Sequence, residues 1–191
     1  MTAEQQFWKW FQTNDEQLFN FESNQERTFD LLLREMHKVN PDLTFEFGPK
    51  QNGRREFIIS ADGIKTAFQK VEELYASAPS LPHWKFVKFR PRRAPADISF
   101  ANISVKASDV KVELKPGNPK ADITVCFPAY SEPERRNYVA LAFLFLDQAL
   151  GEYDVEMHVD RIEVKNTKKA SRESMPIQQL PTAFDKSLGR Q

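Results

Sequence analysis

One seven-residue pattern occurs twice in this chain of 191 residues. Residues 43–49 (LTFEFGP) and 110–116 (VKVELKP) are apolar at the first, third and fifth places, with Glu at the fourth and Pro at the seventh. Such alternation is typical of a β-strand with one buried face. A short polar turn, a second strand-like run, a helix-like stretch and a third strand-like run follow each copy. In the first copy the turn contains Asn52-Gly53, which predicts a β-hairpin. We therefore predict an internal duplication of two ββαβ units, over residues 43–91 and 110–165.

The stretches between the strands predict two different helices. From Ile64 to Ala78 the apolar residues recur at i, i+3, i+4 and i+7, as in an amphipathic helix that lies on a sheet. Residues 139–146 are apolar without interruption, so a helix there needs cover on two sides. The aromatic N-terminal helices, within residues 1–40, are the expected second cover. Ser/Thr-x-x-Glu patterns at Thr13 and Ser23 predict the starts of two of them.

These elements predict an α+β fold with one largely antiparallel sheet. Helices would cover one face of the sheet, the N-terminal helices would pack over them, and the duplication would be related to a ferredoxin-like fold. We expect a single domain over residues 1–165 and a partly docked tail over residues 166–191. Alternation over residues 153–159 predicts the last strand, and a change of phase after it predicts a bulge near Asp160.

The composition narrows the class of protein. Lys and Arg number 27, as do Asp and Glu, so the formal net charge is zero, whereas proteins that coat nucleic acid are usually basic. Cys126 is the only cysteine, which excludes an intramolecular disulfide and favours a reducing cytoplasm. The first residues do not resemble a secretory signal, and the longest apolar run is far below the roughly 20 residues that span a bilayer. We therefore predict a cytoplasmic protein that makes no membrane contact.

The strongest local charge signal is a basic segment with aromatic residues in it. Residues 74–96 contain no Asp or Glu. Its candidate anion- or partner-binding side chains are Lys85, Lys88, Arg90, Arg92 and Arg93, beside Trp84, Phe86 and Phe89. Such a mixture can grip phosphates and stack bases, or it can attract an anionic protein. It also occurs where aromatic residues are core and the charges form a solvated strand edge, and the neutral chain favours this interpretation.

Other candidate sites are weaker. Asp154, Glu156 and His158 would share one face of the predicted last strand, but carboxylates two residues apart are common on solvated faces, so we predict no metal. Trp8 and Trp10 point about 200° apart on a helix, so one of them is a candidate partner anchor. A sheet covered on one side only would expose a second face, whose predicted members are Thr44, Glu46, Lys111, Glu113, Thr124 and Cys126.

Catalytic motifs are missing from the sequence. The three histidines, His37, His83 and His158, lie far apart, and neither a Cys/His nor a Ser/His/Asp arrangement can be argued from them. The six glycines form no phosphate-binding loop, and one cysteine cannot supply a zinc site. We predict no cofactor, and the sequence favours a protein that is not an enzyme.

Three segments resemble those of an uncharacterised family of small bacterial cytoplasmic proteins, a domain of unknown function. They are residues 43–49 (LTFEFGP), 84–93 (WKFVKFRPRR) and 145–154 (FLDQALGEYD). The resemblance implies a bacterial cytoplasmic protein. It carries no mechanistic motif and transfers no site residue.

The leading hypothesis from the sequence is a non-enzymatic protein-interaction or regulatory module with a protein partner. The alternative is a nucleic-acid-binding protein that uses residues 84–93, and a weaker alternative is a metal-dependent hydrolase that uses the outward carboxylates. Complementarity between the basic and acidic regions is also compatible with a homodimer.

Overall fold

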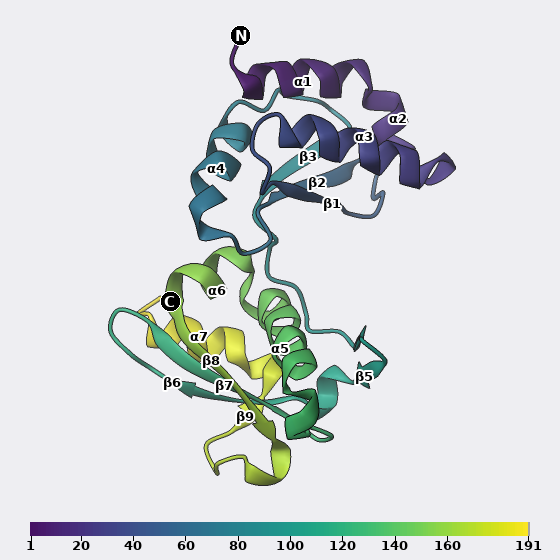
Figure 1. The fold of residues 1–191 in the computed structure, drawn as a ribbon. Helices are drawn as coiled ribbons and strands as arrows, with labels where there is room; N and C mark the ends of the chain where they lie inside the picture. The colour runs from purple at the N-terminus through teal and green to yellow at the C-terminus, as the bar shows by residue number, and fades with distance from the viewer. Residues whose placement is uncertain (191) are drawn as a thin grey trace. The chain divides into compact units, whose positions relative to one another are not determined.

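The chain, described over residues 1–190 in a computed structural model, divides into two compact units (Figure 1). The first runs from Met1 to Arg90 and the second from Pro91 to the end. The change of unit falls in the Pro-rich connection between the two predicted repeats. The α+β class and the largely antiparallel pairing are confirmed, but the single sheet is wrong, because the strands form three separate sheets.

The first unit is a three-stranded sheet with helices before and between its strands. Its elements are α1 (Ala3–Thr13), α2 (Asp15–Phe19), α3 (Gln25–His37), β1 (Thr44–Phe47), β2 (Arg55–Ser60), α4 (Phe68–Ala76) and β3 (Trp84–Lys88). The strand order is β1-β2-β3, with β1 antiparallel and β3 parallel to β2. The turn between β1 and β2 contains Asn52 and Gly53 with φ of 52° and 73°, as the Asn-Gly signal predicts. A parallel pair needs a crossover, and α4 supplies it.

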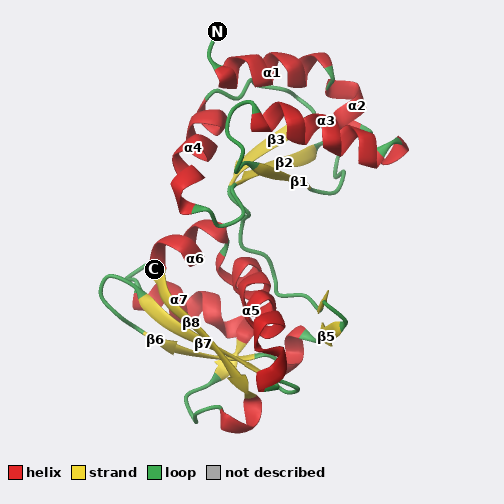
Figure 2. Cartoon of the chain, viewed as in Figure 1, coloured by secondary structure: helices red, strands yellow, loops and turns green. Residues whose placement is uncertain are grey.

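Aromatic rings form the core of the first unit. The α1 rings of Phe7, Trp8 and Phe11 pack around Phe57 of β2, with centroids 5.0–6.4 Å from its ring. Figure 2 shows α1 and α3 lying on the same side of this sheet. The sequence predicts these N-terminal helices as cover for the apolar helix of residues 139–146. The structure shows instead that α1 packs on the β1–β3 sheet.

Two predicted helix caps are wrong. The side chain of Thr13 donates to the carbonyl of Lys9, and that of Ser23 donates to the carbonyl of Asn20. Neither α2 nor α3 has a side-chain cap. The capping box of this unit lies at Thr2, which exchanges hydrogen bonds with Gln5. A hydroxyl at a helix end can bond backward to a free carbonyl as readily as forward to an amide, so the pattern alone does not decide its role.

The second unit contains a hairpin and a four-stranded sheet. Its elements are β4 (Ile98–Phe100), β5 (Ile103–Val105), β6 (Lys111–Lys115), β7 (Ala121–Phe127), α5 (Arg135–Leu150), α6 (Glu152–His158), β8 (Val159–Asn166), β9 (Met175–Pro176) and α7 (Leu180–Ser187). The order in the larger sheet is β8-β7-β6-β9. Strand β6 is antiparallel to β7 and to β9, and β8 is parallel to β7. The predicted tail therefore supplies both a strand and a helix, and Ile177, Leu180 and Phe184 are fully buried.

The predicted strand over residues 153–159 is wrong, because Glu152–His158 is the helix α6. Glu152 and Val155 are the buried positions of α6, and their spacing of three residues is helical. Tyr153 is 40% exposed, so the alternation did not reflect burial. The predicted bulge is confirmed, since Ala121 pairs with Val159 and Asp122 with Arg161, which leaves Asp160 unpaired in the ladder.

Candidate functional site

The basic segment of residues 84–93 is divided between the two units, and the side chains of Lys85, Lys88, Arg90 and Arg92 have carboxylate partners. In the first unit, the Nζ atoms of Lys85 and Lys88 lie 2.8 and 3.0 Å from carboxylate oxygens of Glu56 and Glu72. Arg90 contacts Asp62 at 2.6 Å and also Glu46. Arg93 donates its backbone amide to Gln148 in the second unit. The charges of Lys85, Lys88 and Arg90 are therefore balanced by carboxylates within the first unit.

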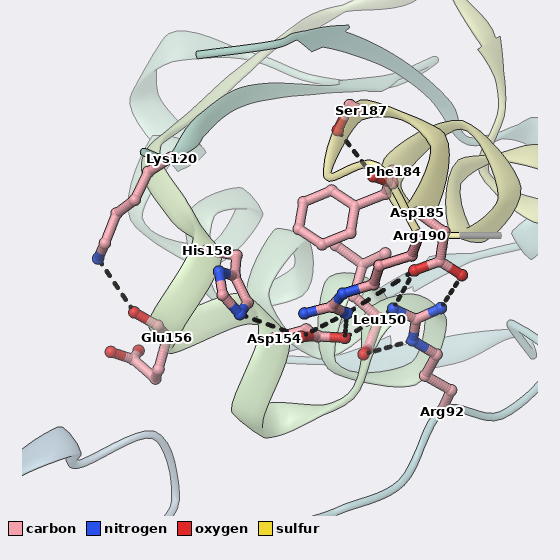
Figure 3. Close-up of polar contacts among 10 residues, drawn as sticks. All are labelled: Arg92, Lys120, Leu150, Asp154, Glu156, His158, Phe184, Asp185, Ser187 and Arg190. Atoms are coloured by element: carbon pink, nitrogen blue, oxygen red, sulfur yellow. Dashed lines mark hydrogen bonds and ion pairs between the residues drawn. The ribbon is translucent and has the colours of Figure 1, made fainter. Parts of the chain in front are cut away.

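Arg92 is the centre of a four-residue ionic network (Figure 3). Its guanidinium donates to both carboxylate oxygens of Asp185 at 2.7 and 2.8 Å, to Asp154 at 2.6 Å and to the Leu150 carbonyl at 2.9 Å. Arg190 also binds Asp154. Burial opposes ionisation of Asp154, but the hydrogen bonds from Arg190 and Arg92 lower its pKa below the ordinary value. The network links α6 and α7 to the segment at the start of the second unit. Arg92 therefore has a structural role.

The two tryptophans proposed as anchors differ in burial. Trp8 is 3% exposed, and its indole N–H donates to the carbonyl of Leu74 at 2.8 Å. Trp10 is half-buried on the same helix, with its ring 6.4 Å from that of Phe7. Trp8 is therefore a core residue of the first unit, and Trp10 is the more accessible of the pair.

The predicted open sheet face is only partly open, and it belongs to two sheets. Thr44 and Glu46 lie on β1, whereas Lys111, Glu113, Thr124 and Cys126 lie on β6 and β7. Glu113 and Thr124 line a polar groove of about 420 Å³, with Lys115, Asp122, Arg161 and Glu163 among its other residues. Glu113 is held there by Lys165 at 2.8 Å. Cys126 is fully buried, and burial raises its pKa to about 11, so this thiol lies inside the unit and not on an accessible face.

The acidic and histidine side chains form no metal centre. Asp154, Glu156 and His158 lie on α6 and not on one strand face. His158 is 3.7 Å from Asp154, whose oxygens bind arginines. Among residues 1–190, no group of three or more His, Cys, Asp or Glu side chains could hold a metal ion.

The feature that sequence reasoning missed is an apolar groove between α3 and β1. It encloses about 600 Å³, and its apolar residues are Phe21, Phe29, Leu33, Phe45 and Phe47. All five are only half-buried. The ring of Phe29 lies 5.1 Å from that of Phe45, and the rings of Phe21 and Phe47 stack at 4.9 Å. Gln25, Asp30, Thr44 and Glu46 supply its polar rim.

A buried arginine fixes one end wall of this groove. The Arg55 side chain on β2 is 2% exposed, and its guanidinium carbon lies 4.3 Å from the centre of the Phe21 ring. It binds Glu22, the residue next to Phe21, and this hydrogen bond lowers the pKa of Glu22 to about 2. The Nε and Nη1 atoms of Arg55 have no hydrogen-bond partner within the described part of the chain. The cation–π contact of Arg55 with the Phe21 ring and its ion pair with Glu22 thus fix the position of Phe21.

Comparison with known proteins adds no relative. No family model, curated protein or solved structure matches this chain. Among the described residues, none of the helices has the length and apolarity needed to span a bilayer.

Proposed function

We propose that this protein is a non-catalytic interaction module that binds a segment of a partner protein in the groove between α3 and β1. The observation that carries the proposal is the half-exposed set of Phe21, Phe29, Leu33, Phe45 and Phe47 around one cavity. Fully burying an exposed side chain of this kind contributes roughly 1.5–3 kcal/mol, so each half-exposed one forgoes roughly half of that. A partner that covers them recovers part of this free energy.

The composition of the groove also supports a protein ligand. Aromatic and aliphatic side chains line the floor, and a few polar groups stand at the rim, which is the usual composition of a recognition groove. The nucleic-acid alternative draws less support, since Lys85, Lys88, Arg90 and Arg92 are each bonded to carboxylates that would have to be displaced by phosphate.

We also retain two narrower proposals from the sequence. The two ββαβ units are proposed to descend from one ancestral unit, because each has a hairpin followed by a helix and a strand parallel to the second strand. The cytoplasm is the proposed setting, because the single cysteine is a buried thiol.

The test is selection of random peptides, displayed on phage, against the whole protein. Leu33→Arg places a charge in the groove, and Leu31→Arg makes the same substitution on the same helix outside it. We expect selected peptides to bind the unchanged protein and Leu31→Arg alike, and to lose at least about tenfold in affinity on Leu33→Arg, or about 1.4 kcal/mol. Circular dichroism shows whether both variants fold. Peptides indifferent to Leu33→Arg, or no selected peptides at all, would contradict the proposal.

A further inference from the structure

We propose that the partner segment binds as an additional β-strand, antiparallel to β1, with an apolar–basic–apolar sequence. This inference rests on the proposed function, because it names the partner and binding mode of the same groove. It depends on the hydrogen-bonding direction of β1, on the course of the groove, on the way the second unit completes its own sheet, and on the charge at Glu46.

The outer edge of β1 presents backbone groups to a ligand. The Gly48 amide donates to the Glu56 carbonyl at 3.0 Å, so this pair is a hydrogen-bonded one in the β1–β2 ladder. Hydrogen-bonded and non-hydrogen-bonded pairs alternate in antiparallel strands. Glu46 and Thr44 therefore bond to β2, while the N–H and C=O groups of Phe45 and Phe47 point away from it. Because β1 is an edge strand of its sheet, these groups lie at an edge with which no other strand pairs among the described residues.

The groove follows this edge. All four residues of β1 line it, although the side chains of Phe45 and Phe47 lie on the opposite face of the sheet from those of Thr44 and Glu46. A cavity on one face of the sheet would be lined by the side chains of only every second residue of β1, so the groove runs along the edge of the strand. The opposite wall comes from α3, through Phe29 and Leu33. A strand added to β1 would thus have one set of side chains between β1 and α3.

The second unit provides a precedent for this arrangement. Its corresponding edge strand, β6, accepts β9 as an antiparallel neighbour, with Met175 opposite Val112. The Ile177 amide donates to the Val110 carbonyl at 3.2 Å. The added segment alternates apolar Met175 and Ile177 around Pro176, and Ile177 is fully buried. In the first unit no such strand pairs with β1 among the described residues.

The groove favours particular side chains on the added strand. Residues opposite Phe45 and Phe47 would enter the aromatic side of the groove, so apolar residues fit there. The residue between them would lie opposite Glu46. Glu46, Asp62 and Arg90 are in contact, and together they carry a net charge of −1, which favours Lys or Arg at that place. A second copy of β1 in the matching register would place Glu46 opposite Glu46, which is destabilising.

The probe is an acetylated and amidated peptide of sequence TKVKVKT, and binding is followed by the backbone amide resonances of Phe45 and Phe47. In the proposed arrangement, the amide of each valine donates to β1, while the amide of the central lysine points outward. N-methylation of either valine should therefore weaken binding by at least about tenfold, the effect of losing a well-made hydrogen bond and introducing a clash. N-methylation of the central lysine should change affinity less than about twofold.

A charge exchange tests the residue opposite Glu46. Glu46→Gln should weaken TKVKVKT by about two- to fivefold, the range of a cross-strand ion pair, and should leave the affinity of TQVQVQT unchanged. A variant at the same strand face, Thr44→Ser, serves as control. Equal effects on both peptides would overturn the basic position.

These results separate the two proposals. If selected peptides bind in a Leu33-dependent way, but N-methylation of the valines weakens binding no more than N-methylation of the central lysine, strand addition is wrong and the proposed interaction groove stands. Strand addition is equally wrong if those peptides bind but TKVKVKT does not. Loss of binding only on N-methylation of lysine would also overturn the antiparallel arrangement. If no peptide binds in a Leu33-dependent way, the proposed function itself fails. Dimerisation through β1, detected by sedimentation and abolished by Phe45→Lys, would replace the peptide with a second copy.

Discussion

The two larger sheets share an arrangement of three strands, β1-β2-β3 and β6-β7-β8, but differ at the outer edge of the first of these strands. Each begins with an antiparallel hairpin and adds a third strand parallel to the second. In the second unit, β9 pairs with the outer edge of the first hairpin strand, and α7 follows it into the core. In the first unit the corresponding edge of β1 borders a groove of about 600 Å³. The chain thus completes one edge with its own residues, and among the described residues it pairs no strand with the other.

The cores differ as well. The first unit contains 11 of the 16 phenylalanines and all three tryptophans. The second is mainly aliphatic, with Val, Leu, Ile and Ala predominant among its buried residues. A large ring fills more space than an aliphatic side chain, so each aromatic residue of the first unit carries a larger share of its packing.

Removing β9 and α7 from the edge of β6 should have the largest effect on stability. Truncation after Glu173 removes β9 together with Ile177, Leu180 and Phe184, each fully buried. Loss of each such side chain costs about 2–5 kcal/mol, and together they rival the whole stability of a typical domain. We expect the second unit to unfold, seen as a large loss of ellipticity and of dispersed methyl resonances. A truncated protein with unchanged spectra would show that β9 is dispensable and that the two edges do not differ in this way.

The next effect concerns the aromatic core. Phe57 is fully buried between rings of α1, β1 and β3, so Phe57→Ala should destabilise the first unit by about 3–5 kcal/mol. Urea unfolding followed by tryptophan emission measures this, because all three tryptophans lie in the first unit. The control is Tyr75→Ala, at a position 38% exposed in the same unit, which should cost far less. Equal costs would contradict the assignment of the core.

A smaller effect should follow from loss of the Arg92 network. Arg92→Ala removes hydrogen bonds to Asp185, Asp154 and the Leu150 carbonyl. Bonds to charged groups contribute about 1.5–3 kcal/mol, and the partial exposure of Arg92 reduces this to about 1–2 kcal/mol. The free energy of unfolding from circular dichroism checks the value. Arg92→Lys, which keeps the charge without the planar fork, should restore only part of it; full restoration would contradict the bidentate geometry.

The smallest effect is a pH dependence in the first unit. The hydrogen bond from Arg55 lowers the pKa of Glu22 from 4.5 to about 2 in the folded protein. A depressed carboxyl pKa contributes stability that is present above 4.5 and is lost as the pH falls toward about 2. We expect urea midpoints from tryptophan emission to decrease over this interval, and Glu22→Gln to reduce the slope. An identical slope in Glu22→Gln would show that other carboxylates cause it.

Much of the fold could be predicted because its signals are local. The Asn52-Gly53 turn, the strand alternation and the amphipathic α4 are each specified by a few neighbouring residues. The α6 helix was missed because residues 153–159 alternate like a strand, and only the burial of Glu152 and Val155 reveals the helical spacing. Strand order is not a local property. The sequence therefore identified Phe45 and Phe47 as apolar strand residues but held no signal that β1 lies at an edge.

The groove was missed for the same reason. Phe29 and Leu33 belong to a helical stripe that normally predicts core, yet they are half-exposed beside the edge of β1, with which no other element pairs among the described residues. The basic segment, in contrast, was conspicuous in the sequence, yet its partners Glu46, Glu56 and Glu72 are brought to it by folding.

The burial of Cys126 makes the protein convenient for chemical labelling. Thiol reagents attack the thiolate, and a fully buried group with a pKa of about 11 presents almost none at neutral pH. A cysteine introduced at an exposed site, such as Asp30 on the rim of the groove, would then react selectively while the natural residue stays in place. Dyes or spin labels can thus be attached beside β1 in an otherwise unaltered chain.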